Sequence, residues 1–515
     1  MKHPLLTLSL FLLCLTASVG LTACQPASPA TGTGGTITDI PATPTATAVP
    51  LKTLVVCLGS EPESLYLYGN LNPSAWSVLE AVYDGPIDTV HYQPQPVILE
   101  TLPTQENGGV KLSAVEVNAG DLVANTEGDV VALTKGVEVF PENCSSSGCA
   151  VKYDGSSPLR IAQMSATFKL KQGISWSDGT PLTADDSVYS YAVASDPAVT
   201  AGRNLTDKTA SYRALDAQTV EWTGKPGYLT QNPSAFFFSP LPQHQLNQLT
   251  PQDLLTAPQA ARTPLGWGPF QVDEWVAGDH IRLVKNPHYY RASDGLPKID
   301  VLVYRFLGSA ADTVVSPLLN GECDVMDPSL DLQGQYSNIL DLQKKGSLKA
   351  TFGVGPEWEG LYFGIQPASY DDTYNPWVDR QDFFGDVRTR QAIAYCTDRN
   401  ALNQQLFAGE SVVPASYLPP DHPFLDGTLA ALPYDPQKGS ALLDEAGWKD
   451  NDQDPATPRT ASNVQGVLDG TAFTISFTAT ESELHARVAE SLTQSLASCG
   501  IEVKTHLAPV SETYA

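Results

Sequence analysis

The sequence predicts an α/β fold with more than one domain, from its length, its composition and one supersecondary unit near its end. The chain has 515 residues, which is more than one domain usually holds. Hydrophobic residues make up 42% and charged residues 17%, a balance typical of packed globular proteins. Residues 473–507 have the pattern of a strand, a helix and a second strand, which predicts a parallel pair with a right-handed crossover.

The N-terminus has the features of a bacterial lipoprotein signal. Two basic residues precede the apolar run Leu5–Leu15, which is too short for a stable membrane span. Small residues then lead to Leu21–Cys24, which resembles a lipobox. This order predicts a signal peptide over residues 1–23 and a lipid anchor on Cys24, and an ordinary signal peptide with a chance cysteine is the alternative. The predicted location is extracytoplasmic, on the outer face of the bacterial cell membrane or in the periplasm.

The linker and the first strands follow in order. Residues 24–50 are rich in Thr, Ala, Pro and Gly and predict a disordered, lipid-anchored linker. Residues 53–58 are apolar and β-branched, as in a buried strand, and Gly59–Pro62 ends that strand. Residues 95–165 are polar, Gly-rich and weakly alternating, which predicts an antiparallel β subdomain or insertion.

The middle of the chain alternates between short strands and helices. Thr183 and Asp186 predict a capping box that opens a helix ending near residues 196–197. Residues 270–284 predict a hairpin around Gly278-Asp279, and residues 299–306 a further strand. A helix is expected at about residues 309–320, with a strand at 323–326 after it.

The last third has the clearest signals. Asp386 is expected to open one helix, and Asp435-Pro436 another that ends at Gly447. Thr480 is expected to cap the helix of the β-α-β unit, with Glu483 as its capping-box partner. That helix carries an apolar stripe at Leu484, Val488, Leu492 and Leu496.

Charge and cysteine content limit the function classes. Lys and Arg number 30 against 57 Asp and Glu, so the net charge is −27, which disfavours nucleic acid and anionic membrane surfaces as partners. Of eight cysteines, Cys14 leaves with the signal peptide and Cys24 takes the lipid, and the even remainder in an exported chain favours disulfides. No Cys/His spacing suggests zinc, so no metal site and no cofactor is predicted.

Several short segments of the chain form an ordered set. They are Phe168–Ile174 with Trp176–Asp186, Gly266–Phe270 with Asn286–Tyr290, Leu319–Val325, Asp386–Ile393, Asp398-Arg399 and Ala441–Trp448. Together they resemble the solute-binding proteins of family 5, the extracellular peptide- and nickel-type receptors of ABC importers. The segments occur in family order, and the ordered set is far more specific than any one of them.

The resemblance implies a two-lobe, periplasmic-binding-protein-like fold of type II, in which the ligand is enclosed when two α/β lobes close. Lobe I would span residues 51–355, with an inserted β-rich subdomain at about residues 80–200, and lobe II residues 356–515. The family normally continues beyond the strand matching residues 501–507, and an acidic residue that holds a peptide's amino group lies in that continuation. Lobe II is therefore expected to be incomplete, and peptide binding by residues 1–515 alone to be weak or absent.

The function implied by the resemblance is capture of oligopeptides in the cleft between the lobes and delivery to the permease subunits of an ABC importer. A nickel chelate, haem or an oligosaccharide is the alternative ligand within the same family. An exported hydrolase is less expected, because neither a Gly-x-Ser-x-Gly nor a His-Glu-x-x-His motif is present. The protein is thus predicted not to be an enzyme, and a surface lipoprotein without a ligand remains a further alternative.

Three residues are candidates for contact with the ligand. Glu61 follows the first strand at the edge expected to face the cleft, and its role would be to pair with an amine or cation. A turn carboxylate before Pro62 is the equally plausible alternative. Trp267 and Tyr362 are candidates for stacking on ligand side chains, with packing inside a lobe as the favoured alternative.

The resemblance also implies how the cysteines pair. The fold places the strands of Cys57 and Cys323 near each other in lobe I, which predicts a disulfide between them. The short spacing of Cys144 and Cys149 suits a local disulfide, and Cys396 is expected to pair with Cys499.

Overall fold

The computed structural model describes most of the chain after residue 49. The described residues are 50–144, 147–308, 314–330, 332, 334–355, 357–365, 374–378, 380–454 and 457–513. The compact unit begins at Leu51. The predicted signal peptide, Cys24 and nearly all of the linker lie outside the described residues. Within those residues, no helix combines the length and the apolar character needed to cross a bilayer.

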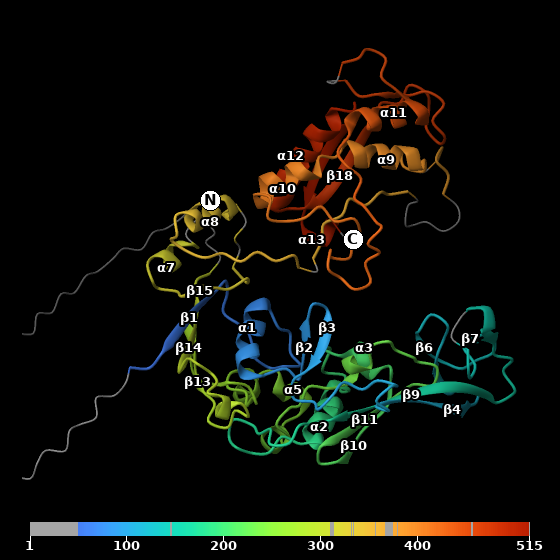
Figure 1. The fold of residues 1–515 in the computed structure, drawn as a ribbon. Coiled ribbons are helices and arrows are strands. Elements are labelled where there is room, and N and C mark those ends of the chain that lie inside the picture. Colours follow the sequence, from blue (N-terminus) through green and yellow to red (C-terminus); the bar gives the residue numbers. More distant parts are fainter. Residues whose placement is uncertain are drawn as a thin grey trace, which may run out of the picture. The chain divides into compact units, whose positions relative to one another are not determined.

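A five-stranded sheet with the order β12-β13-β14-β1-β15 organises the N-terminal part of this unit (Figure 1). β1 (Thr53–Leu58) pairs in parallel with β14 (Val301–Phe306) and with β15 (Val325–Met326). β12 (Phe270–Val276) and β13 (His280–Lys285) form the predicted hairpin. The buried end of β1 carries Val56, Cys57 and Leu58, which explains why this strand reads as a continuous apolar run.

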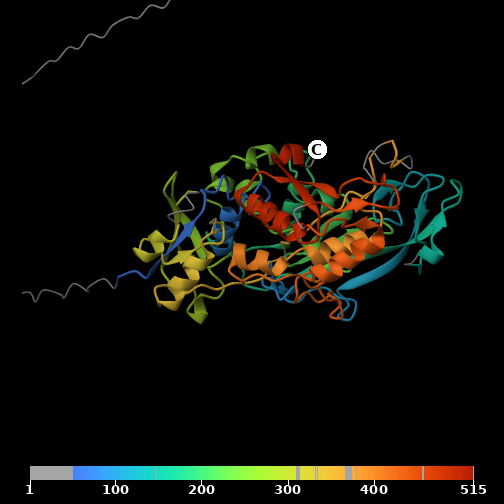
Figure 2. The same ribbon diagram turned by 90° about the horizontal axis from the view of Figure 1, so that it is seen from above.

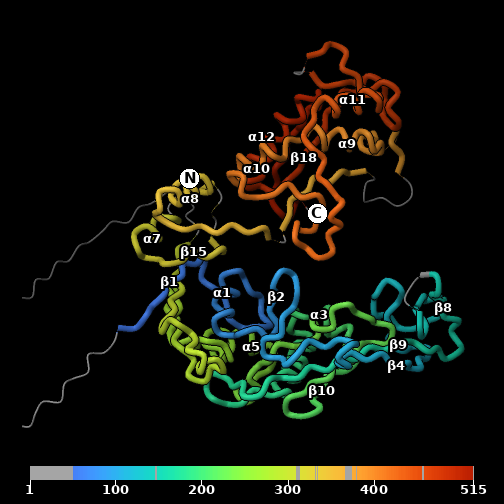
Figure 3. Tube along the Cα trace, in the orientation of Figure 1, coloured from blue at the N-terminus to red at the C-terminus, as the bar shows by residue number. Residues whose placement is uncertain are grey.

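A second sheet is antiparallel and has the order β10-β11-β9-β4. The long strands β4 (Val110–Val117) and β9 (Leu159–Lys169) lie side by side in Figure 3, and β10 (Thr209–Asp216) and β11 (Thr219–Gly224) complete the sheet. The antiparallel strands predicted within residues 95–165 are confirmed. Three two-stranded ladders accompany them: β2 (Ile87–Val90) with β3 (Gln93–Pro96), β5 (Leu122–Ala124) with β6 (Val130–Ala132), and β7 (Glu138–Val139) with β8 (Val151–Lys152).

Two longer helices and several short ones connect these strands. α1 (Pro73–Val82) is capped by Asn72, and α2 (Ala184–Ala194) begins at the capping box of Thr183 and Asp186, which confirms that prediction. Of the helix predicted at about residues 309–320, residues 309–313 lie outside the described residues, and the described part contains the short helix α7 (Ser316–Leu319). The shorter elements are η1 (Ser147–Cys149), α3 (Arg203–Thr206), η2 (Pro233–Phe236), α4 (Gln243–Leu246), α5 (Pro251–Leu254), α6 (Pro258–Ala261), η3 (Ala292–Asp294), α7 (Ser316–Leu319) and α8 (Tyr336–Lys344).

The C-terminal part has its own sheet and helices, drawn in orange and red in Figure 2. β18 (Thr474–Thr480) and β19 (Glu502–Ala508) pair in parallel across helix α12 (Glu483–Ala497), so the predicted β-α-β unit is confirmed. The remaining elements are α9 (Val387–Cys396), α10 (Arg399–Phe407), α11 (Pro436–Ala446), β16 (Trp448–Lys449), β17 (Thr460–Ala461) and α13 (Val510–Thr513).

One predicted helix cap is wrong. Ser482 caps α12, and its side chain accepts a hydrogen bond from the His485 amide. Thr480 is instead the last residue of β18, and its hydroxyl lies 2.6 Å from Nδ1 of His485. Both residues are good N-caps by type, and the length of the parallel ladder decides which one opens the helix.

The buried side chains form separate cores. The largest joins α1 and both sheets of the N-terminal part and contains Phe168, Trp176, Trp222 and Trp267. Another core joins α9, α11 and α12 with β18 around Trp448 and Phe473, whose rings stack with centroids 4.0 Å apart. Each core has its own strands and helices, which is the arrangement of a chain with more than one domain.

Within the described residues, three disulfides join the pairs that the sequence and the resemblance led us to expect. They are Cys57–Cys323, Cys144–Cys149 and Cys396–Cys499. Gly439 on α11 lies against the third disulfide, and a Cβ at this position would overlap Cys396 Sγ. The glycine therefore allows α9 and α11 to approach each other closely.

Candidate functional site

A cavity of about 830 Å³ lies beside helix α10. Most of its lining comes from α10, from the extended residues before Ile365, and from the loop that follows α10, and Tyr336 of α8 and Leu484 of α12 complete it. A second cavity of about 310 Å³ adjoins it and shares part of this lining. Both cavities are lined by Trp358, Glu359, Arg399, Pro414, Ser416 and Tyr417.

The start of α10 is fixed by hydrogen bonds to neighbouring elements. Asp398 caps the helix by accepting from the Ala401 amide at 2.9 Å. The Asp398 amide donates to Ser495 Oγ at 2.7 Å, and that hydroxyl donates to the Cys396 carbonyl at 2.7 Å. Arg399 is the first helical residue, so these bonds hold its backbone against α9 and α12.

The side chain of Asn403 holds the start of the loop after α10. Asn403 donates from Nδ2 to the Ser411 carbonyl at 2.8 Å and accepts from the Ser411 amide at 3.2 Å. These two hydrogen bonds hold Ser411 next to α10. The cavity residues Val412 to Pro420 therefore start from a defined position.

Aromatic side chains give the cavity exposed ring faces. Trp358 is 46% exposed and Tyr417 is 65% exposed, and their ring centroids lie 6.4 Å apart. Tyr336 and Phe407 make a second, edge-on pair with centroids 5.8 Å apart, and both line the larger cavity. Exposed aromatic faces in a cavity of this size are typical of binding sites for organic ligands.

Three side chains that are charged at neutral pH line the cavities: Glu357, Glu359 and Arg399. One oxygen of Glu359 lies 3.5 Å from Nε2 of His485. Arg399 donates to the Leu432 carbonyl, and its partial burial lowers its pKa, although a guanidinium remains charged at neutral pH. Among the described residues, no hydrogen bond or ion pair engages the carboxylate of Glu357.

The structure places Tyr362 beside these cavities. Its ring is 78% exposed and lies 6.1 Å from the ring of Trp358, centroid to centroid. It does not belong to the lining of either cavity. Tyr362 is therefore available to a ligand that extends beyond the cavity, and its role in binding stays a prediction.

Glu61 has intramolecular partners on both carboxylate oxygens. Its Oε1 accepts from Trp275 Nε1 at 2.8 Å, and its Oε2 accepts from the Gly278 amide at 2.9 Å. Arg262 lies 3.5 Å from Oε1 and covers the Trp275 ring at 4.0 Å from its centroid. The carboxylate thus connects the end of β1 to the β12-β13 hairpin, so it has a structural role whether or not it also meets a ligand.

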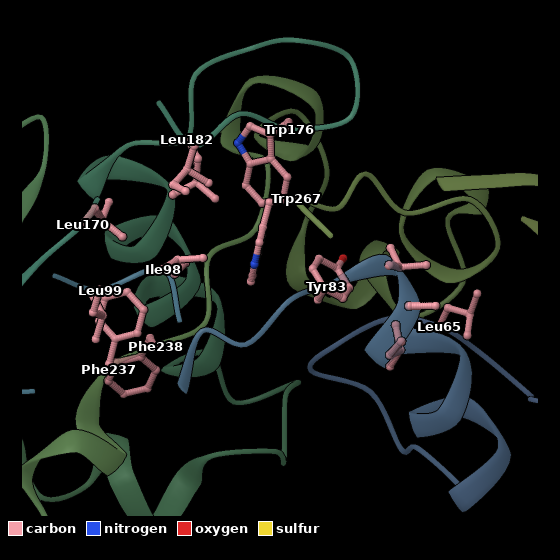
Figure 4. Close-up of a cluster of buried hydrophobic side chains, with 14 of the residues drawn as sticks. Leu65, Tyr83, Ile98, Leu99, Leu170, Trp176, Leu182, Phe237, Phe238 and Trp267 are labelled. Carbon is pink, nitrogen blue, oxygen red and sulfur yellow. The ribbon is translucent and has the colours of Figure 1, made fainter. Parts of the chain in front are cut away.

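Trp267 is packed inside the N-terminal core, which was the favoured alternative to a ligand contact. The side chain is 0% exposed and packs against Trp176 and Tyr83, with ring centroids 5.5 and 4.8 Å away (Figure 4). Its indole N–H donates to the Asp84 carbonyl at 2.8 Å. The flanking residue Gly268 approaches Val82 so closely that a Cβ would lie 2.6 Å from the Val82 carbonyl oxygen, and this approach buries the indole.

The sequence pattern did not single out Trp358, Tyr417 or Arg399 as cavity residues. Trp358 lies between two acidic residues in the segment Glu357–Tyr362 and is not part of an apolar run. This alternation of acidic and aromatic residues is the one available signal in the sequence. Nothing in the spacing relates Trp358 to Tyr417. Their proximity depends on the way α10 and its loop fold back.

More than half of this chain matches one known protein family. The family model described as bacterial extracellular solute-binding proteins, family 5 Middle, matches residues 163–514. Oligopeptide-binding protein AppA of Bacillus subtilis is 26% identical over 353 residues, covering 66% of this chain and 57% of AppA. Oligopeptide-binding protein OppA of Lactococcus lactis is 27% identical over 315 residues, covering 56% of this chain and 50% of OppA. The chain thus spans about half the length of the curated relatives it matches.

Solved structures share the fold at low sequence identity. The ABC transporter substrate-binding protein CtaP of Listeria monocytogenes superposes with a TM-score of 0.57 at 18% identity, covering 89% of this chain and 74% of CtaP. An oligopeptide-binding protein of Thermotoga maritima gives a TM-score of 0.56 at 18% identity, covering 90% and 73%. These likenesses show the fold: the chain has the two-lobe α/β fold of type II periplasmic binding proteins, as the resemblance led us to expect.

Proposed function

Because this chain belongs to the bacterial extracellular solute-binding proteins of family 5, we propose that it captures oligopeptides outside the cytoplasm and delivers them to the permease of an ABC importer. The observation that carries the proposal is the cavity beside α10. Its volume of about 830 Å³ is in the range of small-molecule sites, and its lining is mainly apolar and aromatic with few polar groups. The curated relatives named above are oligopeptide-binding proteins, which supports a peptide as the ligand.

The cavity offers a peptide two kinds of contact. Trp358, Tyr417 and the apolar residues around Val412 and Leu418 remove apolar side chains from water, which is the non-directional part of binding. Ser416, Arg399 and Glu357 present polar atoms to the same space and can satisfy the ends or backbone of the peptide. We assign the residues before 356 to lobe I and those from 356 onward to lobe II, so that lobe II supplies most of this surface.

Trp358 should carry much of the affinity of this cavity. Of the two outcomes that the sequence left open, weak or absent binding, the cavity beside α10 favours weak binding. We expect the chain to bind a random pentapeptide pool weakly but saturably, and Trp358→Ala to weaken that binding by roughly tenfold or more, because exposed aromatic anchors dominate binding energy. Isothermal titration calorimetry of the full chain measures both. Trp377→Ala is the matched control, since Trp377 is 60% exposed and lies outside both cavities. Equal affinity in the wild type and Trp358→Ala would exclude the cavity as the site, and no binding at all would contradict the proposed function.

The chain is proposed to be anchored to the membrane by a lipid on Cys24. The support is the order of apolar run, small residues and cysteine, followed by a linker of 26 residues, Gln25–Pro50, whose only charge is Asp39. When expressed in bacteria, the wild type should partition into the detergent phase and Cys24→Ser into the aqueous phase. Partitioning of both proteins into the aqueous phase would exclude the anchor without affecting the proposal for ligand binding.

A further inference from the structure

The charges that line the cavity beside α10 are unequal in sign. The lining residues that are charged at neutral pH are Glu357, Glu359 and Arg399, so the lining has two carboxylates and one guanidinium. Arg399 is partly withdrawn, because it is half-buried and donates to the Leu432 carbonyl. Glu357 and Glu359 are both exposed, and the Glu357 carboxylate has no partner among the described residues. The accessible charge in the cavity is therefore negative.

The two carboxylates line the same cavity as an exposed aromatic ring. Glu357 and Glu359 are the sequence neighbours of Trp358, whose half-exposed ring is paired with that of Tyr417 at 6.4 Å between centroids. An ammonium or guanidinium group placed over an indole face is attracted by the ring, and a nearby carboxylate adds a charge-assisted hydrogen bond. Among the described residues that line the cavity, Arg399 is the one cationic side chain that could pair with an anionic group.

We propose that this cavity selects peptides with a cationic side chain, lysine or arginine, through Glu357 and Glu359 together with the ring faces of Trp358 and Tyr417. The inference rests on the proposed function and adds a preference within it. The net charge of −27 acts in the same direction, because it raises the local concentration of cationic peptides around the whole protein. The local contribution from the cavity must therefore be separated from this general one.

Three pentapeptides that differ only at the central residue separate these contributions: Ala-Ala-Lys-Ala-Ala, Ala-Ala-Gln-Ala-Ala and Ala-Ala-Glu-Ala-Ala. With identical termini, each difference in affinity reports the central side chain. At low ionic strength we expect the lysine peptide to bind the full chain roughly tenfold more tightly than the glutamine peptide, with the glutamate peptide weakest. The preference should shrink as salt is added, because the carboxylates are exposed.

The decisive variant is the double substitution Glu357→Gln and Glu359→Gln, which should bring the lysine-to-glutamine affinity ratio close to one. A pair of substitutions elsewhere, Glu127→Gln and Glu490→Gln, changes the net charge equally and should leave the ratio unchanged. Both of these control residues lie outside the two cavities. The control for folding is the temperature of thermal unfolding, which should be the same in both double variants as in the wild type.

The outcomes distinguish the preference from the underlying function. If all three peptides bind equally, or if the glutamate peptide binds best, the cavity has no cationic preference and this inference is wrong while the proposed function stands. If the ratio persists in the Glu357→Gln/Glu359→Gln protein, the preference comes from elsewhere and the assignment to this cavity is wrong. If none of the peptides binds, the proposed function fails and this inference with it.

Discussion

Replacement of Arg459 by methionine should lower the free energy of unfolding of the C-terminal core by about 3–5 kcal/mol, because it removes the hydrogen-bond donors of a buried network. The Arg459 side chain is only 6% exposed. Its Nε donates to the Cys499 carbonyl at 2.8 Å, and its Nη1 donates to the Trp448 carbonyl at 3.0 Å and to Asp444 at 2.8 Å. Methionine keeps much of the volume but leaves two buried carbonyl oxygens without a donor.

Hydrogen exchange measured by mass spectrometry is the appropriate test, since a chain with more than one core need not unfold in a single step. Peptides from α11 and β18 should lose protection in Arg459→Met, whereas peptides from β9 and β11 should not change. Asp444→Asn is the matched control: the side chain of Asp444 is 52% exposed and asparagine still accepts a hydrogen bond, so we expect less than about 1 kcal/mol. Equal protection in Arg459→Met and the wild type would mean that the network contributes little to the core.

Removal of the Cys57–Cys323 disulfide should destabilise the N-terminal core by roughly 3–5 kcal/mol in the chain-entropy account. The two cysteines are 266 residues apart in sequence, so the bond closes a very long loop in the unfolded chain. Both side chains are buried, and they join β1 to the segment just before β15. The double substitution Cys57→Ala and Cys323→Ala removes the bond without leaving a reactive thiol.

The Cys144–Cys149 disulfide is the comparison for this prediction. Its cysteines are only 5 residues apart, so the loop-closure contribution should be smaller by about 3 kcal/mol. Hydrogen exchange of peptides from β1 and β14 measures the effect of the long-range disulfide, and peptides from β4 and β9 that of the short-range one. If both pairs of alanine substitutions destabilise equally, loop length does not govern the contribution of these disulfides.

The features that the sequence predicted well depend on interactions between residues that are close together in the chain. Asp435, Pro436 and Gly447 predict both ends of a helix, and α11 begins and ends at these positions. The Asp435 side chain accepts from the Lys438 amide at 3.0 Å, which is a bond between near neighbours that any fold of this segment would permit. Capping, turn formation and helical periodicity are decided within one or two turns of chain, so their sequence patterns are informative.

Ligand contact could not be read from residue type because burial depends on distant neighbours. Trp267 occurs in a glycine-flanked segment that would suit either an exposed aromatic or a packed one. Its burial depends on Val82, Tyr83 and Trp176, which lie far away in sequence. The donors to Glu61 are similarly remote, 201 to 217 residues along the chain. A turn carboxylate and a ligand-binding carboxylate look the same until those donors are known.

The sequence by itself determined the first buried strand, the hairpin at residues 270–284, both ends of the helix between Asp435 and Gly447, the β-α-β unit at residues 473–507 and, through an ordered set of short segments, the family. These features rest on backbone propensity and periodicity, which each segment carries alone. Only the tertiary structure decided that Trp267 is packed while Trp358 is exposed, and that Trp358, Arg399 and Tyr417 share a cavity. The physical reason is that a cavity is a property of the space between segments, and that space exists only after Asp398, Asn403 and their partners have fixed how α10 and its loop return beside residues 357–361.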